Sequence, residues 1–234
     1  MDTVASLDIG SHRKASKMET DAIRDYLATS KKAVLQTQVG AEALQAAVHQ
    51  RWSVKTGADP EAQNLVGQAP TVTTIAQLCA IAVPAVLPPD GRSVGAEETV
   101  YQLDATLIGY KHESDGDYHL VVVDDHGNTM VAEIPDPAKL APGSFFADLI
   151  AAARHAFEAQ FAIKPTAAPA QALTGPAPAL TRATESVTIQ GLGFFDFAHG
   201  QDGVAPNAIE LHPVTGIAFG GSAPGNATTV PTTQ

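Results

Sequence analysis

The chain has a single cysteine among its 234 residues. One cysteine cannot build a disulfide framework, and it cannot supply the repeated thiolates of a cysteine metal site. Cys79 lies in an apolar run, where a buried and unreactive thiol is the expected form. The sequence therefore excludes disulfide-stapled folds and metal sites that depend on several cysteines.

Long apolar runs are also missing. No stretch approaches the roughly 20 consecutive apolar residues that a membrane-spanning helix needs. The start of the sequence lacks the basic region and apolar core of a secretory signal. We therefore expect a cytoplasmic protein with no membrane contact, in which the glycosylation sequon at Asn226 is a chance match.

Basic residues are scarce. Lys and Arg number 14 against 25 Asp and Glu, which gives a formal net charge of -11. Between Val100 and Asp136 the imbalance is strongest, because Lys111 is the one Lys or Arg beside eight acidic residues. Such a surface repels a phosphate backbone. We predict a protein or small-molecule partner of neutral or basic character, and no nucleic acid.

The sequence does contain five strand-like runs and one amphipathic helix. Alternating apolar and polar residues predict strands at 100–110, 118–124, 129–134, 187–197 and 208–219. Apolar residues at helical spacing from 146 to 161 predict a helix between the third and fourth strands, with Ser144 as its cap. This order is that of a five-stranded OB-type β-barrel. Pro213 predicts a bulge or an edge position in the last strand.

The predicted barrel occupies residues 98–219, and the remaining segments need separate assignments. Helical spacing and two helix-start signals, Asp59 with Pro60 and the capping box from Thr74 to Gln77, predict a small helical region over 16–97. Alanine and proline dominate 164–185, which predicts a loose connector inside the barrel region. A disordered start is expected at 1–15, and a disordered tail at 220–234.

Three blocks of the sequence are the basis of a family resemblance. They are residues 118–137, residues 193–200 and the stretch Gly-Val-Ala-Pro-Asn-Ala-Ile-Glu-Leu-His-Pro-Val that runs from Gly203 to Val214. In these blocks the chain resembles an uncharacterised bacterial family with an OB-like fold. The resemblance covers roughly residues 99–219, so it supports the domain boundaries, and it implies no particular activity.

The segment from His119 to Asp124 is also similar to a segment of staphylococcal-nuclease-like enzymes, which use an OB barrel. That resemblance implies that Asp124 is a metal ligand and that Asp104 is a second carboxylate from the neighbouring strand. The chain departs from the family pattern at three points: histidine stands at 119 in place of arginine, Gly127 stands in place of a glutamate, and no arginine lies between residues 100 and 136 to stabilise a charged phosphate.

The most interesting polar side chains are His119, Glu133, His199, Glu210 and His212. Glu210 and His212 are two apart in a predicted strand, so both project from the same face, and His119 and Glu133 join them if the strand registers agree. Imidazoles with carboxylates suit zinc or another divalent ion. The alternative is that these residues form the polar outer face of the barrel, or that the histidines bind loop backbone.

Glu113, Asp115 and Asp117 alternate their oxygens in the style of a calcium loop, but the full ligand spacing is absent. A tight hairpin at Asp115 and Gly116 explains them without a metal. Asn207, just before the last strand, is interpreted as a loop-closing residue. Of Phe194, Phe195 and Phe197, core packing is expected to account for at least two.

Two hypotheses follow. The first is a non-catalytic OB-like binding or assembly module that has no cofactor, an acidic surface and a capacity to form homo-oligomers. The second is a divalent-metal-dependent hydrolase that uses the His and Glu residues on the barrel, or Asp104 and Asp124 in the nuclease-like version.

Overall fold

The computed structural model describes residues 51–164, 179–197 and 200–220. The expectations for 1–15, for the first part of the helical region, 16–50, and for the tail beyond residue 220 therefore lie outside the described residues. So do most of the predicted connector and the candidate ligand His199.

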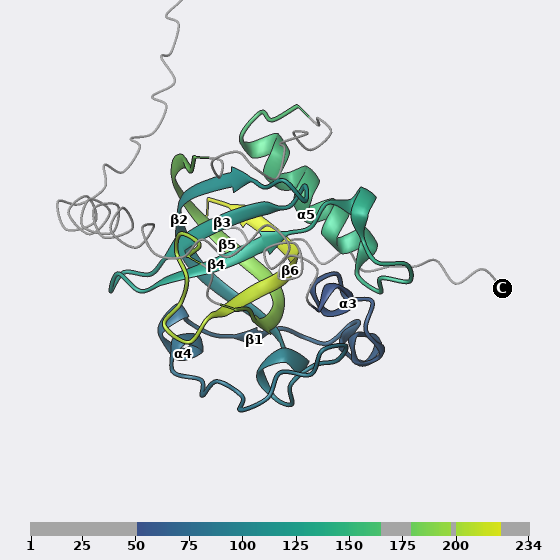
Figure 1. Ribbon diagram of the computed structural model, residues 1–234. Helices are drawn as coiled ribbons and strands as arrows, with labels where there is room; N and C mark the ends of the chain where they lie inside the picture. Colours follow the sequence, from purple (N-terminus) through teal and green to yellow (C-terminus); the bar gives the residue numbers. More distant parts are fainter. Residues whose placement is uncertain (1–50, 165–178, 198–199, 221–234) are drawn as a thin grey trace, which may run out of the picture.

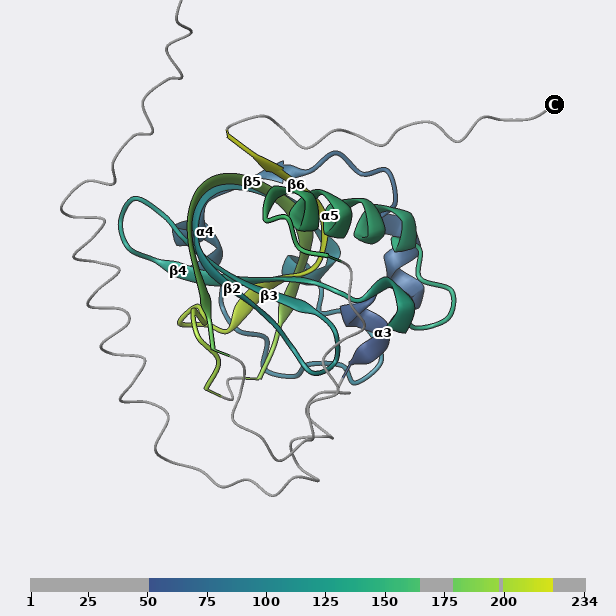
Figure 2. The same cartoon turned by 90° about the horizontal axis from the view of Figure 1, so that it is seen from above.

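Six strands form one mixed sheet, and five of them close a hydrogen-bonded ring (Figures 1 and 2). The strands are β1 (Thr71–Val72), β2 (Val100–His112), β3 (Tyr118–Val123), β4 (Thr129–Ile134), β5 (Thr181–Phe195) and β6 (Ile209–Phe219). Their order is β1-β2-β3-β4-β6-β5, and an additional pairing of β2 with β5 closes the circuit. We call the circuit β2-β3-β4-β6-β5 the ring. All its pairings are antiparallel except that of β4 with β6.

The first three ring strands confirm the predicted meander. Gly116 and Gly127 have φ angles of 100° and 84° in the two hairpins, a conformation that glycine adopts without steric cost. β3 ends at Val123, one residue before the predicted end. The reason is local, because the carboxylate of Asp124 accepts hydrogen bonds from the backbone N–H groups of His126 and Asn128 and so belongs to the turn.

The predicted start of β5 at residue 187 and the connector boundary at 185 are wrong. β5 begins at Thr181, and Thr181 pairs with Tyr110. β2 is long enough to offer hydrogen-bond partners along this whole stretch, so tertiary pairing overrides the weak local signal of the sequence. At its other end β5 stops at Phe195, where the predicted strand continued to Phe197.

Pro213 lies in β6, between β4 and β5, rather than at an edge. The pairing of β5 with β6 shifts register on both sides of Gly191, opposite the proline. This irregularity confirms the bulge of the two predicted alternatives, since proline has no N–H to give to a regular ladder. The His212–Pro213 peptide bond is cis.

The helix between the third and fourth ring strands, α5, spans Ala147–Gln160. Its buried residues include Ile150, Ala153 and Phe157, which confirms the predicted apolar face. The predicted serine cap is wrong, because Phe146 occupies the N-cap position. The Ser144 hydroxyl accepts the backbone N–H of Phe146 at 3.4 Å and donates to the backbone oxygen of Thr56 at 2.6 Å, which ties the start of the helix to the segment before the ring.

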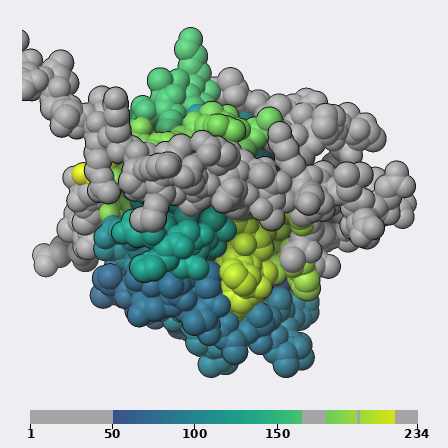
Figure 3. Space-filling view, turned by 90° about the vertical axis from the view of Figure 1, so that its left-hand side faces the viewer, coloured from purple at the N-terminus to yellow at the C-terminus, as the bar shows by residue number. Residues whose placement is uncertain are grey.

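Residues 51–99, which we call the covering segment, contain β1 and several short helices. The helices are α3 (Trp52–Lys55), α4 (Ile75–Cys79) and the 3-10 helices Pro60–Leu65 and Ala96–Glu98. Both predicted helix-start signals are confirmed. The Asp59 carboxylate accepts the backbone N–H of Ala62, and Thr74 with Gln77 forms a capping box. Two fully buried ion pairs hold the segment together, Arg92 with Asp59 and Arg51 with Glu97. Figure 3 shows this segment in blue beside the ring strands in teal and yellow.

The main hydrophobic core fills the inside of the ring and the contact with α5. A smaller apolar cluster joins the covering segment to the start of α5, through residues such as Leu65, Phe146 and Leu192.

Cys79 is half-buried at the edge of the main core, and burial raises the pKa of its thiol. None of the helices in the described part of the chain is long and apolar enough to cross a membrane.

Candidate functional site

A cluster of polar side chains lies on the outer face of the ring, where β3, β4 and β6 are neighbours. Strand alternation sends Leu120, Ala132 and Leu211 into the core, so His119, Glu133, Glu210 and His212 project from the opposite face. The sequence-based alternative of a polar outer face is therefore correct about the side to which these residues project. All four side chains are buried there.

Two other elements cover this face. The covering segment contributes Arg51 and Lys55, which lie over the ring of Phe194 at 4.7 Å and 5.3 Å from its centroid. The connection between β5 and β6 contributes Gly203, whose φ of 86° and close approach to Val121 leave no space for a side chain. Burial of the polar cluster is thus produced by residues far away in the sequence.

His119 and Glu133 face each other in the β3–β4 ladder. His119 Nδ1 lies 3.0 Å from Glu133 Oε1, and its Nε2 lies 2.9 Å from the backbone oxygen of Asp202. Both neighbours are acceptors, so both ring nitrogens carry protons. Burial lowers the pKa of His119, but the hydrogen bond and the charge of Glu133 outweigh burial, and the pKa of His119 is raised.

His212 is the second histidine of the cluster. Its Nδ1 lies 3.0 Å from Glu210 Oε1 and 3.4 Å from Glu133 Oε2. Its Nε2 points to Asp117 Oδ2 at 3.9 Å, beyond hydrogen-bond distance. Burial lowers the pKa of His212 to about 4.

Asp117 belongs to this site, and our sequence analysis assigned it to the hairpin alone. It ends the β2–β3 turn just before β3, and its Oδ1 accepts the backbone N–H of Asp136 at 2.8 Å. Burial, followed by the charges of Asp115 and Glu133, raises the pKa of Asp117 well above its usual value. The alternation of Glu113, Asp115 and Asp117 was the one signal of a binding role.

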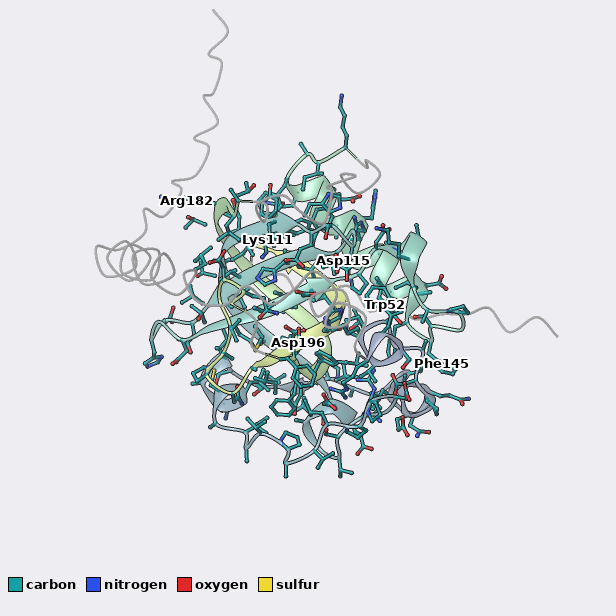
Figure 4. All side chains as sticks on the ribbon, viewed as in Figure 1. Trp52, Lys111, Asp115, Phe145, Arg182 and Asp196 are labelled. Atoms are coloured by element: carbon teal, nitrogen blue, oxygen red, sulfur yellow. The ribbon has the colours of Figure 1, made fainter. Side chains whose placement is uncertain are left out.

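Lys55 and Asp196 complete the cluster, and the sequence analysis singled out neither for this site. Lys55 Nζ lies 3.2 Å from Asp196 Oδ2, and both side chains are about nine-tenths buried. Burial lowers the pKa of Lys55, but Asp196, Glu210 and Glu133 together raise it. Figure 4 labels Asp196 near the centre of the view and Asp115 above it, whereas Arg182 and Phe145 lie at the periphery.

Like charges crowd the site. The pKa of Glu133 is lowered because hydrogen bonding to His119 and the charge of His212 outweigh the effect of burial. Burial raises the pKa of Glu210 well above its usual value, and the charges of Glu133 and Asp196 raise it further. Three buried carboxylates, those of Asp117, Glu133 and Glu210, thus share one small region with Lys55.

The two nuclease-like candidates lie elsewhere. Asp104 is exposed on β2 and accepts a hydrogen bond from the Thr188 hydroxyl. Both carboxylate oxygens of Asp124 bind groups of its own turn. Across the described residues, the group whose geometry could hold a metal is Asp117, Glu133 and His212, with one ligand atom from each within 4.8 Å of the others.

The structure also places the other residues that the sequence analysis considered. Asn207 donates to the backbone oxygens of Leu78 and Ile81, which confirms its loop-closing role. Phe195 lies in the core, Phe194 is buried on the outer face against His212, and Phe197 is 47% exposed.

Comparisons of the chain with family models, with curated proteins and with solved structures gave no match. The resemblances to the OB-like family and to nuclease-like enzymes therefore stay predictions. The site has to be interpreted from its own geometry.

Proposed function

We propose that the ring is an OB-type barrel and that the chain is a non-catalytic binding module for cationic groups. The order of the ring strands, the parallel pairing of β4 with β6 and the position of α5 are those expected for such a barrel. OB barrels bind ligands on the face of their second and third strands, between the first hairpin and the connection of the last two strands. The corresponding elements here are β3, β4, the hairpin at 112–118 and the connection at 196–208.

The observation that carries the proposal is the buried ammonium of Lys55 at this face. A cationic group from the covering segment is held there by Asp196, with Glu210 and Glu133 close enough to raise its pKa. At the rim of the same face, Glu113 and Asp115 are only partly buried and extend the acidic surface toward solvent. A surface with this charge distribution attracts cations and repels phosphates.

A thermal-shift series on the full chain tests the proposal. Spermidine, a short lysine peptide and divalent chlorides are compared with ATP and a short DNA oligonucleotide at matched ionic strength. A ligand that binds only the folded form raises the melting temperature by mass action. We expect the cationic probes to raise it and the anionic probes to leave it unchanged. Stabilisation by ATP or DNA, with no effect of the cations, would overturn the proposal.

A rim variant sharpens the same test. Glu113→Gln combined with Asp115→Asn removes two charges beside the face while keeping the size of the side chains. Asp125→Asn with Asp104→Asn removes two exposed charges elsewhere. The response to spermidine should weaken in the first double variant and persist in the second, because salt screens exposed charges more than about 10 Å apart.

A divalent-metal hydrolase is the second candidate, favoured by the ligand group of Asp117, Glu133 and His212. This candidate requires turnover of a phosphodiester or peptide substrate by metal-loaded protein, and loss of turnover in Asp117→Asn.

Homo-oligomer formation also stays a prediction, and light scattering on the full chain measures it directly.

A further inference from the structure

Two buried polar atoms in the cluster have no hydrogen-bond partner among the described residues. They are Asp117 Oδ2 and His212 Nε2, which face each other at 3.9 Å. Each residue is 1% exposed. A buried acceptor without a partner costs about 1–3 kcal/mol, and more if it is charged. Two such atoms that point at one another need a shared partner that the protein chain does not supply there.

The other polar atoms of the same side chains are held in place. Asp117 Oδ1 accepts the N–H of Asp136, and Glu133 Oε1 lies 3.0 Å from His119 Nδ1. His212 Nδ1 lies 3.0 Å from Glu210 Oε1. A carboxylate that accepts the proton of one histidine nitrogen leaves the other nitrogen as a lone pair, which is the usual second-shell arrangement around a metal-binding histidine. Asp117 Oδ2 and His212 Nε2 are therefore left without a partner, and Glu133 Oε2 lies beside them, 3.4 Å from His212 Nδ1.

We propose that Asp117, Glu133 and His212 bind one divalent first-row metal ion, with Zn²⁺ as the preferred ion. The proposal rests on the cation-binding function above and names the cation for that same face. One imidazole nitrogen and two carboxylate oxygens form a common donor set for zinc, whereas calcium takes six to eight oxygens. Cysteine is not required, because nitrogen and oxygen ligands suffice.

The spacing of the donor atoms fits a metal ion after a small adjustment. Ligands at zinc-bond lengths in a tetrahedron are about 3.4 Å apart. The observed separation of His212 Nε2 from Asp117 Oδ2 is 3.9 Å, and the three donor atoms lie within 4.8 Å of one another. The closure that brings them to zinc-ligand spacing is about 0.5 Å for His212 Nε2 and Asp117 Oδ2 and at most about 1.4 Å for any pair.

His119 and Glu210 act as positioning residues. His119 binds no metal here, since both of its nitrogens already face protein oxygens. It fixes Glu133, and Glu210 fixes His212. Lys55 pairs with Asp196, and the charges of Glu210 and Glu133 act on its ammonium as well.

The experiment uses the full chain, stripped with EDTA and dialysed. Titration calorimetry with ZnCl₂, MnCl₂, MgCl₂ and CaCl₂ is combined with elemental analysis after desalting. We expect one equivalent of Zn²⁺ per chain, weaker binding of Mn²⁺, and little binding of Mg²⁺ or Ca²⁺. Zinc should also raise the melting temperature.

Three substitutions locate the site. Asp117→Asn keeps the shape of the side chain and places an amide where it can donate to His212 Nε2, so the EDTA-treated variant should fold at least as stably as the wild type. Its zinc affinity should fall by at least about 100-fold, because a ligand matters more than a second-shell residue. Glu210→Gln should weaken zinc binding by about 10-fold, as expected for a positioning residue. Asp125→Asn removes one exposed charge outside the site and should leave the affinity within about 3-fold.

Failure of this inference is distinguishable from failure of the proposed function. Wild-type protein that binds no zinc, or Asp117→Asn that binds it with unchanged affinity, would overturn the metal site. The proposed function still stands in that case if spermidine or the lysine peptide raises the melting temperature. It falls separately if neither those probes nor any metal ion has an effect.

Discussion

The inner and outer faces of β3, β4 and β6 bury different kinds of side chain, although the same strands form both. The inner face buries apolar side chains such as Leu120, Ala132 and Leu211 against one another and against α5. The outer face buries His119, Glu133 and His212, whose charges and hydrogen bonds need partners from other elements. Apolar burial is non-directional, whereas buried polar groups must be matched one by one. The outer face therefore depends on polar partners from the covering segment, whereas the inner face takes only apolar side chains from it, Ile75 and Leu78 among them.

The largest effect should come from the inner face. Phe157 on α5 is fully buried and contacts the rings of Tyr110, Tyr118 and Phe161. Phe157→Ala leaves a cavity, which should lower the free energy of unfolding by about 4 kcal/mol in urea titrations. Phe197→Ala is the matched control, because that ring is 47% exposed and should contribute under about 1 kcal/mol. Equal losses in the two variants would contradict the placement of the core.

The ion pair that anchors the covering segment should rank next. Glu97 binds Arg51 through both oxygens and accepts the N–H groups of Ser93 and Phe195. Glu97→Ala leaves a buried guanidinium without its partner, which should cost about 3 kcal/mol in the same urea titration. Glu98→Ala, at the adjacent and partly exposed residue, should cost far less. If Glu97→Ala unfolds at the wild-type midpoint, the segment is not held by this pair.

The acid sensitivity of the outer face follows from the same carboxylate. Burial raises the pKa of Glu97, but hydrogen bonds from Arg51 and then from Phe195 and Ser93 outweigh burial and hold the pKa below its ordinary value of 4.5. Its stabilising effect is therefore complete above pH 4.5 and is lost as the pH falls through the folded-state pKa. Melting temperatures recorded from pH 6 to pH 3 should fall less steeply in Glu97→Gln than in the wild type. Parallel curves would argue against this linkage.

The smallest effect should come from a turn. Asp124 binds two backbone N–H groups and the side-chain amide of Asn128, so Asp124→Ala should reduce stability by about 1 kcal/mol. The nuclease-like resemblance makes a different prediction, namely that this carboxylate is needed for metal binding. Calorimetry of Asp124→Ala with Zn²⁺ and with Ca²⁺ separates the two, since a turn residue should leave both affinities unchanged.

Local patterns were sufficient where each residue's neighbours in sequence are also its neighbours in space. The two hairpins, the helix-start signals at Asp59 and Thr74 and the apolar face of α5 are of this kind, and the structure confirms them. Glu210 and His212 also share a face, as two-residue spacing in a strand requires. The start of β5 failed because its pairing with β2 is not encoded in the local alternation of its residues.

The candidate site could be predicted only in part for the same reason. His119, Glu133, Glu210 and His212 are brought together by strand registers that the sequence leaves open. The sequence assigns Asp117 to a hairpin, and no pattern in the sequence connects Lys55 with this site. Their roles appear only when the hairpin and the covering segment are placed against the ring.

The sequence by itself determined the acidic balance, the order of the ring strands with the helix between the third and the fourth, and the presence of histidines and carboxylates that could serve as ligands. The tertiary structure decided which of those side chains meet, and that they meet out of contact with water. The physical reason is the distance along the sequence over which each kind of interaction acts. Alternation and capping act over a few residues, whereas burial of a charge and convergence of donor atoms depend on segments that only folding brings together.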